Sequence, residues 1–239
     1  DLTELYGEAF SARYKEYIKM AEAGKLRTFD KVPARQQFKR ILTSLQATSH
    51  PWLTWKDTIN VRALNNNTGT IHLSNLCTEI TLPQDKNNIA TCNLVSINLS
   101  AFLGEDKTWD WDRLKEAARA AVRQLDNLCD ITQTPIPEAM HSNQQTRAIG
   151  LGIMGLSDVL EKLGYCYESK EAYDLVDQLT EFISYHAIDQ SADLAKELGS
   201  YPTFAGSGWS KGILPIDTVD KLSKDRGVKV KIDQKTRLD

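Results

Sequence analysis

Two long helical stretches limit the folds open to this chain more than any other feature. From Trp111 to Asp130, apolar residues return every three or four positions on one face, and Asp110 is a suitable N-cap. The longer stretch runs from about Ser169 to Leu198 and ends at Gly199, a residue type favoured just after a helix. Because long helices in globular proteins are stabilised mainly by packing one face, these two predict a sizeable core.

Shorter elements surround these helices. Apolar spacing predicts further helices at Glu8–Ala23, Pro33–Ala47 and Leu156–Leu163. Runs that alternate or are rich in strand-forming residues predict strands at Trp52–Ile59, Thr70–Leu73 and Thr91–Leu99. Strands interleaved with long helices indicate an α/β or α+β architecture. The strands are too few to close a sheet alone, so we expect neighbouring chain to complete it.

Composition excludes several classes of protein. Of the 239 residues, 41% are hydrophobic and the net charge is −3, with no basic patch for nucleic acid and no apolar run that could span a bilayer. Four cysteines without a CxxC pair, and four scattered histidines, argue against a disulfide scaffold or a metal site. They favour a cytoplasmic setting with reduced thiols. The chain begins at Asp1 without a Met, which we interpret as a cut within a larger polypeptide or a processed end.

One short run carries a possible catalytic constellation. Asn75, Cys77 and Glu79 stand at alternate positions, and in an extended strand or loop such residues point to the same side. An amide, a thiol and a carboxyl group would then converge on one small volume, which suits general-base and sulfur chemistry on one substrate. The competing interpretation is that the string arises by chance and that Cys77 is a small buried apolar residue.

Two other signals point to packing. Gly150, Gly152 and Gly155 match the dinucleotide-binding fingerprint as a string, but the polar residues before them are not a strand, so close backbone packing is the better interpretation. Cys129 near the end of a helix and Cys166 after another are predicted to be packing residues.

Several strings together resemble one known family. The run Ser74–Ile80 is similar to the active-site finger loop of ribonucleotide reductase large subunits. Further strings resemble that family in the same order, and the likeness extends from near residue 2 to about Leu222: Cys92–Leu99, Arg147–Asp158, Asp193–Gly199 and Ser210–Pro215.

The resemblance implies roles for individual residues. Cys77 matches the cysteine that becomes a thiyl radical and takes the 3′ hydrogen of the ribose, and Glu79 matches the base for the 3′-hydroxyl proton. Asn75 matches the amide that holds the same edge of the ribose, and Ser74 is expected to contribute to substrate binding. Cys92 matches one member of the dithiol that supplies two electrons and closes to a disulfide.

The resemblance also implies a fold. The family has a ten-stranded α/β barrel with flanking long helices and with the finger loop threading its centre. We expect the whole chain to be one segment of that catalytic barrel. Residues 1–50 would form a helical lead-in, 51–222 the strands, finger loop and helices, and 223–239 a charged tail.

Cofactors and partners follow from the same likeness. The strings are most like the class whose radical comes from a separate metal-bearing small subunit, with no cofactor bound by this chain, a ribonucleoside diphosphate as substrate, and thioredoxin or glutaredoxin as reductant. A second redox cysteine, the allosteric sites, the phosphate loop and the radical-relaying tyrosines are expected on other segments of the catalytic subunit, so the chain alone should not turn over. Two alternatives stay open: an adenosylcobalamin-dependent reductase segment, and a non-catalytic assembly fragment.

Overall fold

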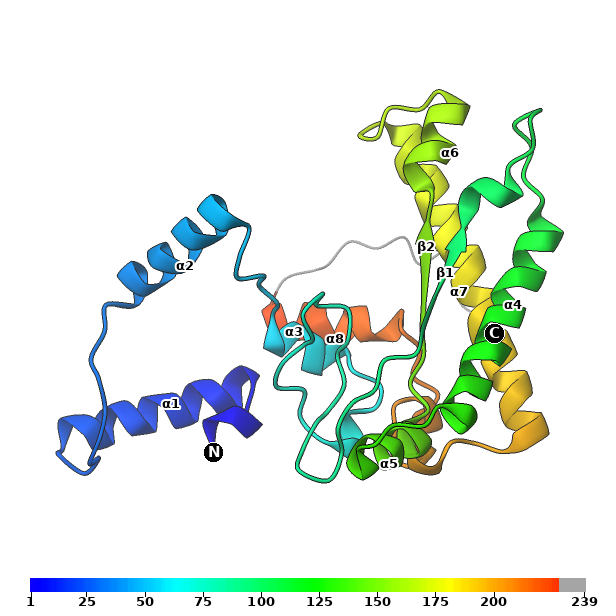
Figure 1. Ribbon diagram of the computed structural model, residues 1–239. Coiled ribbons are helices and arrows are strands. Elements are labelled where there is room, and N and C mark those ends of the chain that lie inside the picture. Colours follow the sequence, from blue (N-terminus) through cyan, green and yellow to red (C-terminus); the bar gives the residue numbers. More distant parts are fainter. Residues whose placement is uncertain (228–239) are drawn as a thin grey trace. The chain divides into compact units, whose positions relative to one another are not determined.

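The computed structural model describes residues 1–227, which form two compact units (Figure 1). The first unit contains residues 1–84 and 206–227, and the second contains residues 85–205. Among the described residues, no helix is both long enough and apolar enough to cross a membrane. The same residues contain no group of three or more His, Cys, Asp or Glu side chains that could hold a metal ion.

A pair of parallel strands and two long helices organise the second unit. Strand β1 (Leu94–Asn98) pairs with β2 (Gly150–Met154), with Leu94 opposite Gly150 and Asn98 opposite Met154. Helices α4 (Trp111–Ile131) and α5 (Pro137–Thr146) lie between them in the chain, and α6 (Leu156–Leu163) and α7 (Lys170–Leu198) follow. Short 3-10 turns at Leu99–Phe102 and Pro202–Phe204 complete the unit. The helix α4 packs along α7 and also contacts β1.

The predicted long helices are confirmed, and their ends have the expected chemistry. Asp110 accepts a hydrogen bond from the Arg113 amide at the start of α4, and Ser169 accepts one from the Ala172 amide at the start of α7. Such caps satisfy amide groups that a helix leaves without partners. The apolar faces of these helices meet in a core whose members are almost fully excluded from solvent: Leu99, Leu114, Ala118, Val159 and Leu179. Each buried leucine contributes roughly 1.5 to 3 kcal/mol to the stability of the unit.

The glycine string lies in β2 and at its end. A Cβ atom at Gly150 would collide with the Leu94 side chain of β1, so glycine permits the close approach of the two strands. Gly155 has φ +76 and a Cβ there would lie 2.6 Å from Asn98 Oδ1. These are packing requirements, in agreement with the interpretation of the string as close packing.

Helices dominate the first unit. It contains α1 (Gly7–Glu22), α2 (Ala34–Thr48), α3 (Lys56–Arg62) and α8 (Asp217–Arg226), with 3-10 turns at Leu2–Glu4, Asn66–Thr68 and Trp209–Lys211. The helices α3 and α8 pack on one another, whereas α1 and α2 bury no side chain fully. Apolar residues on α1 and α2 remain exposed in part: Phe10, Tyr14, Ile18, Phe38 and Leu42.

Two secondary-structure predictions for this unit are wrong. Residues 52–59 are not a strand, because helix α3 begins at Lys56 and its packing on α8 outweighs the strand preference of Ile59 and Val61. Residues 70–73 are not a strand either, because the backbone of Ile71 bonds to the Asn60 side chain instead of to a neighbouring strand.

Helix α8 lies at the end of the described chain and extends into the segment predicted as a charged tail, 223–239. Helix α8 buries Val219 and Leu222, which are three positions apart and therefore share a face. The remainder of the predicted charged tail, from residue 228 onward, lies outside the described residues. In the second unit, the strand predicted at Thr91–Leu99 is present but is limited to β1.

Candidate functional site

A tight turn, not an extended run, carries the candidate catalytic residues. The Thr78 amide donates to the Asn75 carbonyl at 3.1 Å, which closes a turn with Leu76 and Cys77 at its centre. Thr78 takes the left-handed conformation at φ 64, so the chain reverses immediately after Cys77. The extended geometry that the alternation argument assumed is therefore wrong.

The turn nevertheless brings the amide and the carboxylate together. Asn75 Nδ2 donates to Glu79 Oε1 at 2.7 Å, and Asn75 Oδ1 accepts from the Ile80 amide at 3.0 Å. Ser74 Oγ donates to the Ile80 carbonyl at 2.6 Å, which ties the two sides of the turn at its base. Cys77 lies at the tip and is exposed. An oriented carboxylate and a presented thiol therefore share one seven-residue loop, Ser74–Ile80.

The chain leading into this loop is fixed by a buried side chain. Asn60 of α3 is 1% exposed, its Nδ2 donates to the Ile71 carbonyl at 2.8 Å, and its Oδ1 accepts from the Ile71 amide at 2.9 Å. The amide side chain thus replaces a neighbouring strand for Ile71. The same Nδ2 also donates to the Lys56 carbonyl at 2.9 Å, so both hydrogens of this amide nitrogen are bonded within the first unit.

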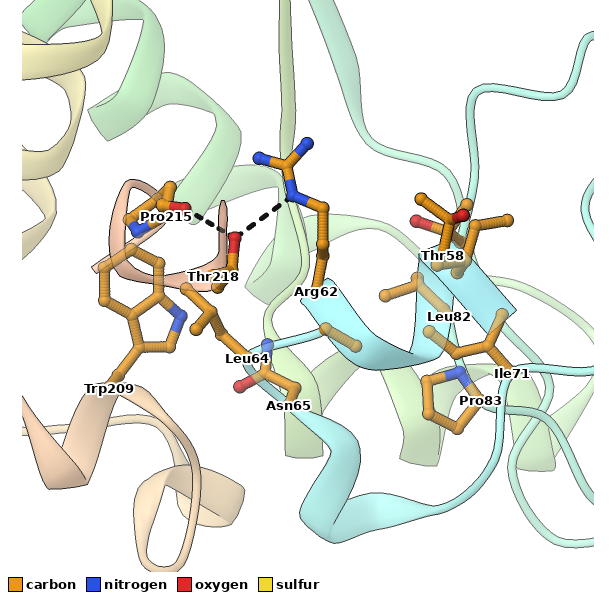
Figure 2. Close-up of a pocket in the computed structure, with 13 residues that line it drawn as sticks. Thr58, Arg62, Leu64, Asn65, Ile71, Leu82, Pro83, Trp209, Pro215 and Thr218 are labelled. Carbon is orange, nitrogen blue, oxygen red and sulfur yellow. Dashed lines mark hydrogen bonds between the residues drawn. The ribbon is translucent and has the colours of Figure 1, made fainter. Parts of the chain in front are cut away.

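A pocket of about 470 Å³ lies at the root of the loop (Figure 2). Its wall includes residues on both sides of Ser74–Ile80, namely Ile71 before it and Thr81, Leu82 and Pro83 after it. On another side, Arg62 Nε donates to Thr218 Oγ1 at 3.1 Å, and Trp209 adds an aromatic face. Asn75, Cys77 and Glu79 do not line this pocket, so the loop tip and the pocket are separate features of the first unit.

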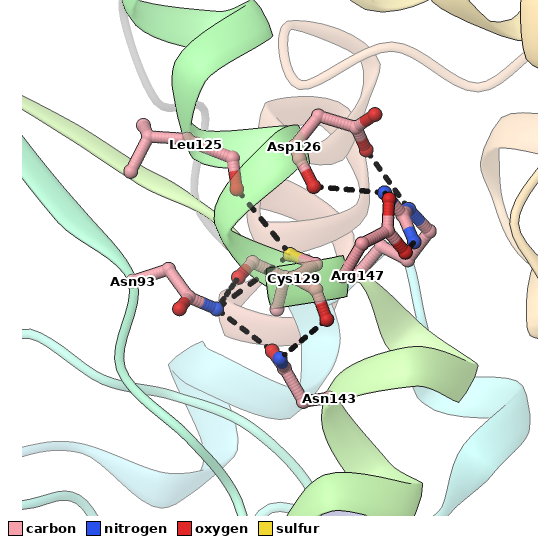
Figure 3. A network of polar contacts seen from close by, with 8 residues as sticks. Asn93, Leu125, Asp126, Cys129, Asn143 and Arg147 are labelled. Carbon is pink, nitrogen blue, oxygen red and sulfur yellow. Dashed lines mark hydrogen bonds and ion pairs between the residues drawn. The ribbon is translucent and has the colours of Figure 1, made fainter. Parts of the chain in front are cut away.

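Cys92 belongs to the second unit, where it lies two residues before β1 and is exposed. The residue that follows it, Asn93, is only 7% exposed. Asn93 belongs to a network of polar contacts that joins the start of β1 to the end of α4 and to the link between α5 and β2 (Figure 3).

An arginine in an unusual conformation closes one side of this network. Arg147 ends α5 with φ 45 and ψ 42, in the left-handed region. Its guanidinium donates to Asp126 Oδ1 at 2.9 Å and to both carboxylate oxygens of Asp130, at 2.6 and 2.9 Å. The guanidinium bond holds the pKa of Asp130 below its usual value, and the two carboxylates raise the pKa of Arg147. This fork fixes the corner between α4 and α5.

The Cys129 thiol lies inside the same corner. It is 1% exposed and donates to the Leu125 carbonyl at 3.5 Å. Burial raises its pKa, and the nearby Arg147 charge opposes that shift to a smaller extent. A buried thiol of raised pKa is a poor nucleophile, which fits its predicted packing role. Cys166, in contrast, is exposed, so the prediction that it is a packing residue is wrong.

The sequence pattern did not single out the buried asparagines that hold the chain before the Ser74–Ile80 loop and the corner between α4 and α5. Asn60, Asn93 and Asn143 are each 7% exposed or less. Asparagine is found on surfaces and in turns so often that its identity alone does not indicate burial. Their positions in the sequence were the available signal. Asn93 directly follows Cys92, so in an extended chain the two side chains point to opposite faces, and Asn143 lies shortly before the string that begins at Arg147.

Comparison with known proteins identifies the family. Residues 1–237 match the family model described as ribonucleotide reductase, barrel domain. The chain therefore belongs to the ribonucleotide reductase barrel-domain family, and the predicted α/β barrel segment is confirmed at that level.

Curated relatives agree with this assignment. The chain is 43% identical over 226 residues to the ribonucleoside-diphosphate reductase subunit alpha of Chlamydia pneumoniae, which is 95% of this chain and 22% of that protein. It is 43% identical over 239 residues to the same-named subunit of Chlamydia trachomatis serovar D, covering 100% of this chain and 23% of the relative. The large subunit of Danio rerio is 37% identical over 224 residues, covering 94% and 28%. The chain spans about a quarter of the length of these relatives.

Proposed function

We propose that this chain is the radical-bearing barrel segment of a ribonucleoside-diphosphate reductase. The observation that carries the proposal is the Ser74–Ile80 loop, where a hydrogen bond of 2.7 Å orients Glu79 against Asn75 and the turn exposes Cys77 beside them. Membership of the barrel-domain family and relatives named ribonucleoside-diphosphate reductase support it. The substrate would be a ribonucleoside diphosphate.

The proposed chemistry divides the work among four side chains. Cys77, as a thiyl radical, takes the 3′ hydrogen atom of the ribose and later returns a hydrogen atom to the same carbon. Glu79 accepts the 3′-hydroxyl proton, and its bond to Asn75 holds the carboxylate in one orientation for that task. Asn75 would also hold the same edge of the ribose. Ser74 would contribute to substrate binding, and its bond to the Ile80 carbonyl holds the loop in place.

Electrons enter from a dithiol. Replacing the 2′ C–OH by C–H releases one water and requires two electrons and two protons. A pair of thiols supplies both when it closes to a disulfide, and Cys92 would be one member of that pair. Thioredoxin or glutaredoxin would then reopen the disulfide by exchange. The second cysteine and the radical source would come from other segments of the catalytic subunit and from a metal-bearing small subunit, in the cytoplasm.

Reconstitution tests the proposal directly. The chain would be mixed with polypeptides that supply the rest of a class I catalytic subunit and with a small subunit, and reduction of a ribonucleoside diphosphate would be measured. We expect turnover that is lost in Cys77→Ser and in Cys92→Ser. Cys166→Ser is the matched control, because Cys166 is also exposed but lies in a loop of the second unit outside the proposed chemistry.

Two outcomes would count against this proposal. A stably assembled complex without turnover favours a non-catalytic assembly fragment. Turnover that is obtained only after adenosylcobalamin is added, without a small subunit, assigns the chain to the cobalamin-dependent class instead.

A further inference from the structure

Asn93, the residue after the exposed Cys92, is held by several buried hydrogen bonds. Asn93 Nδ2 donates to Asn143 Oδ1 at 2.7 Å and to the Ala148 carbonyl at 3.3 Å, and it lies 3.6 Å from Cys129 Sγ. The Asn93 carbonyl accepts from the Gly150 amide at 2.9 Å. Side chain and backbone of this one residue are therefore bonded to three separate parts of the second unit.

Asn143 transmits the position of helix α4 to this point. Its Nδ2 donates to the Cys129 carbonyl at 3.1 Å, in the last turn of α4, while its Oδ1 accepts from Asn93. Asn143 is 4% exposed, and the Arg147 amide donates to its carbonyl at 2.9 Å. The Arg147 fork to Asp126 and Asp130 fixes the same corner from outside. Figure 3 shows Asn143 between Asn93 and the end of α4.

This arrangement determines which way Cys92 points. Successive residues of an extended chain alternate between faces, and the observed sequence of exposed Cys92, buried Asn93 and exposed Leu94 follows that rule. Because Asn93 is bonded inward, Cys92 must present its thiol on the opposite face. A rotation or slip of the backbone here would break the buried amide bonds, and an unpaired buried amide is costly.

We propose that Asn93 and Asn143 are positioning residues for the Cys92 thiol, acting through the buried amide pair that anchors the start of β1. The importance of that position for turnover rests on the proposed role of Cys92 in a dithiol. Thiol–disulfide exchange needs the attacking sulfur in line with the disulfide, so a small displacement of the backbone lowers productive encounters. The orientation of the thiol itself does not depend on the reductase assignment.

The test measures the reactivity of Cys92 in the complete chain. A small aromatic disulfide reacts with the exposed thiols, and peptide mass spectrometry gives separate rate constants for Cys92 and Cys166 across neutral to mildly alkaline pH. The rate limit at high pH reports accessibility and orientation, whereas the midpoint reports the thiol pKa. Asn143 bonds to Asn93 and to the Cys129 carbonyl, so Asn143→Ala removes the buried amide pair that anchors the start of β1.

We expect Asn143→Ala to raise the limiting rate of Cys92 by about threefold or more, because the freed backbone lets the thiol sample more orientations toward a foreign reagent. The rate of Cys166 should stay unchanged. Asn143→Asp keeps an acceptor oxygen for Asn93 but loses the donor to the Cys129 carbonyl, so it should also raise the limiting rate of Cys92. Val159→Ala is the control for loss of stability alone, since Val159 is 1% exposed in the same unit but outside the network.

Equal limiting rates for Cys92 in wild type and in folded Asn143→Ala would overturn the proposal, as would an equal increase in Val159→Ala. If Asn143→Ala does not fold, Arg147→Lys takes its place, because it loosens the same corner, and an unchanged Cys92 rate there also refutes the idea. In reconstituted reductase, Asn143→Ala should lower kcat more than it changes KM. If the wild-type chain shows no reductase activity, the proposed function fails while the thiol measurement still decides the positioning role.

Discussion

Because Arg147 takes the left-handed conformation, we predict that replacing it by glycine destabilises the protein less than replacing it by alanine. Arg147→Ala removes the bonds to Asp126 and Asp130 but keeps a Cβ at φ 45. The Arg147 and Asp126 side chains are 19% and 18% exposed, so the pair is largely shielded from water. Leaving Asp126 without its partner should cost about 2 kcal/mol, below the 3 to 5 kcal/mol of a fully buried pair. The exposed Asp130 adds roughly 0.5 kcal/mol at most.

Arg147→Gly loses the same side-chain bonds but gains in the backbone. A residue with a Cβ pays roughly 1 to 2 kcal/mol in the left-handed region, and glycine does not. Glycine gives back about 0.5 to 1 kcal/mol through the greater freedom of the unfolded chain. We therefore expect Arg147→Gly to be more stable than Arg147→Ala by up to about 1.5 kcal/mol, with a central value of roughly 0.75 kcal/mol. In the interior of a helix the order would be reversed.

Urea unfolding, monitored by hydrogen exchange of peptides from α4 and α5, measures the difference in stability between Arg147→Gly and Arg147→Ala within the second unit. The control is Arg123→Ala, which removes an exposed ion pair to Glu197 between α4 and α7 and should alter stability far less than either Arg147 variant. An Arg147→Gly variant that is as stable as Arg147→Ala, or less stable, would show that residue 147 is not held in the left-handed conformation and would refute the reasoning.

Three further predictions concern the second unit. Leu179→Ala should lower its free energy of unfolding by about 2 to 5 kcal/mol in a urea titration, because Leu179 is 0% exposed and a cavity would remain; a loss below that range would show that the core closes around the gap. In the native protein Cys129 should resist alkylation while Cys166 reacts, and mass spectrometry of the two peptides should show equal labelling only after unfolding. The bonds from Arg119 hold the pKa of Asp193 below the usual value of an aspartate, so this carboxylate stabilises the fold above that usual pKa and the contribution is lost as pH falls through the lower folded pKa. Arg119→Ala should therefore show a weaker loss of stability on acidification below about pH 4 than the wild type, and parallel pH curves would contradict the assignment.

The sequence predicted the helical frame well because strong local signals agreed with tertiary packing there. Asp110 and Ser169 cap their helices as expected, and the apolar faces of α4 and α7 meet in the core. Where the deciding partner was distant in sequence, prediction failed. Residues 70–73 look like a strand, but their backbone partner is the Asn60 side chain, which no periodicity reveals.

In the candidate site, the meeting of Asn75 and Glu79 could be predicted from the sequence, but the geometry by which they meet could not. Asn75 and Glu79 do meet, yet through a turn with Thr78 at φ 64, a conformation that nothing in a Cys-Thr-Glu string demands. The residues that hold Cys92 in place could not be found from local pattern, because Asn93 and Asn143 are 50 positions apart and contact each other only in the folded chain.

The parallel pairing of β1 and β2 has a consequence for the order of folding. Leu94 and Gly150 are 56 positions apart, and closing a loop of that length costs about 3.6 kcal/mol plus a constant before any strand contact is gained. Helix α4 forms from local contacts and shortens the span that must be closed. We expect the helices to precede the strands, so that pulse-labelling hydrogen exchange protects α4 amides before those of β1. The segment that presents Cys92 would then be among the last parts of this unit to become ordered.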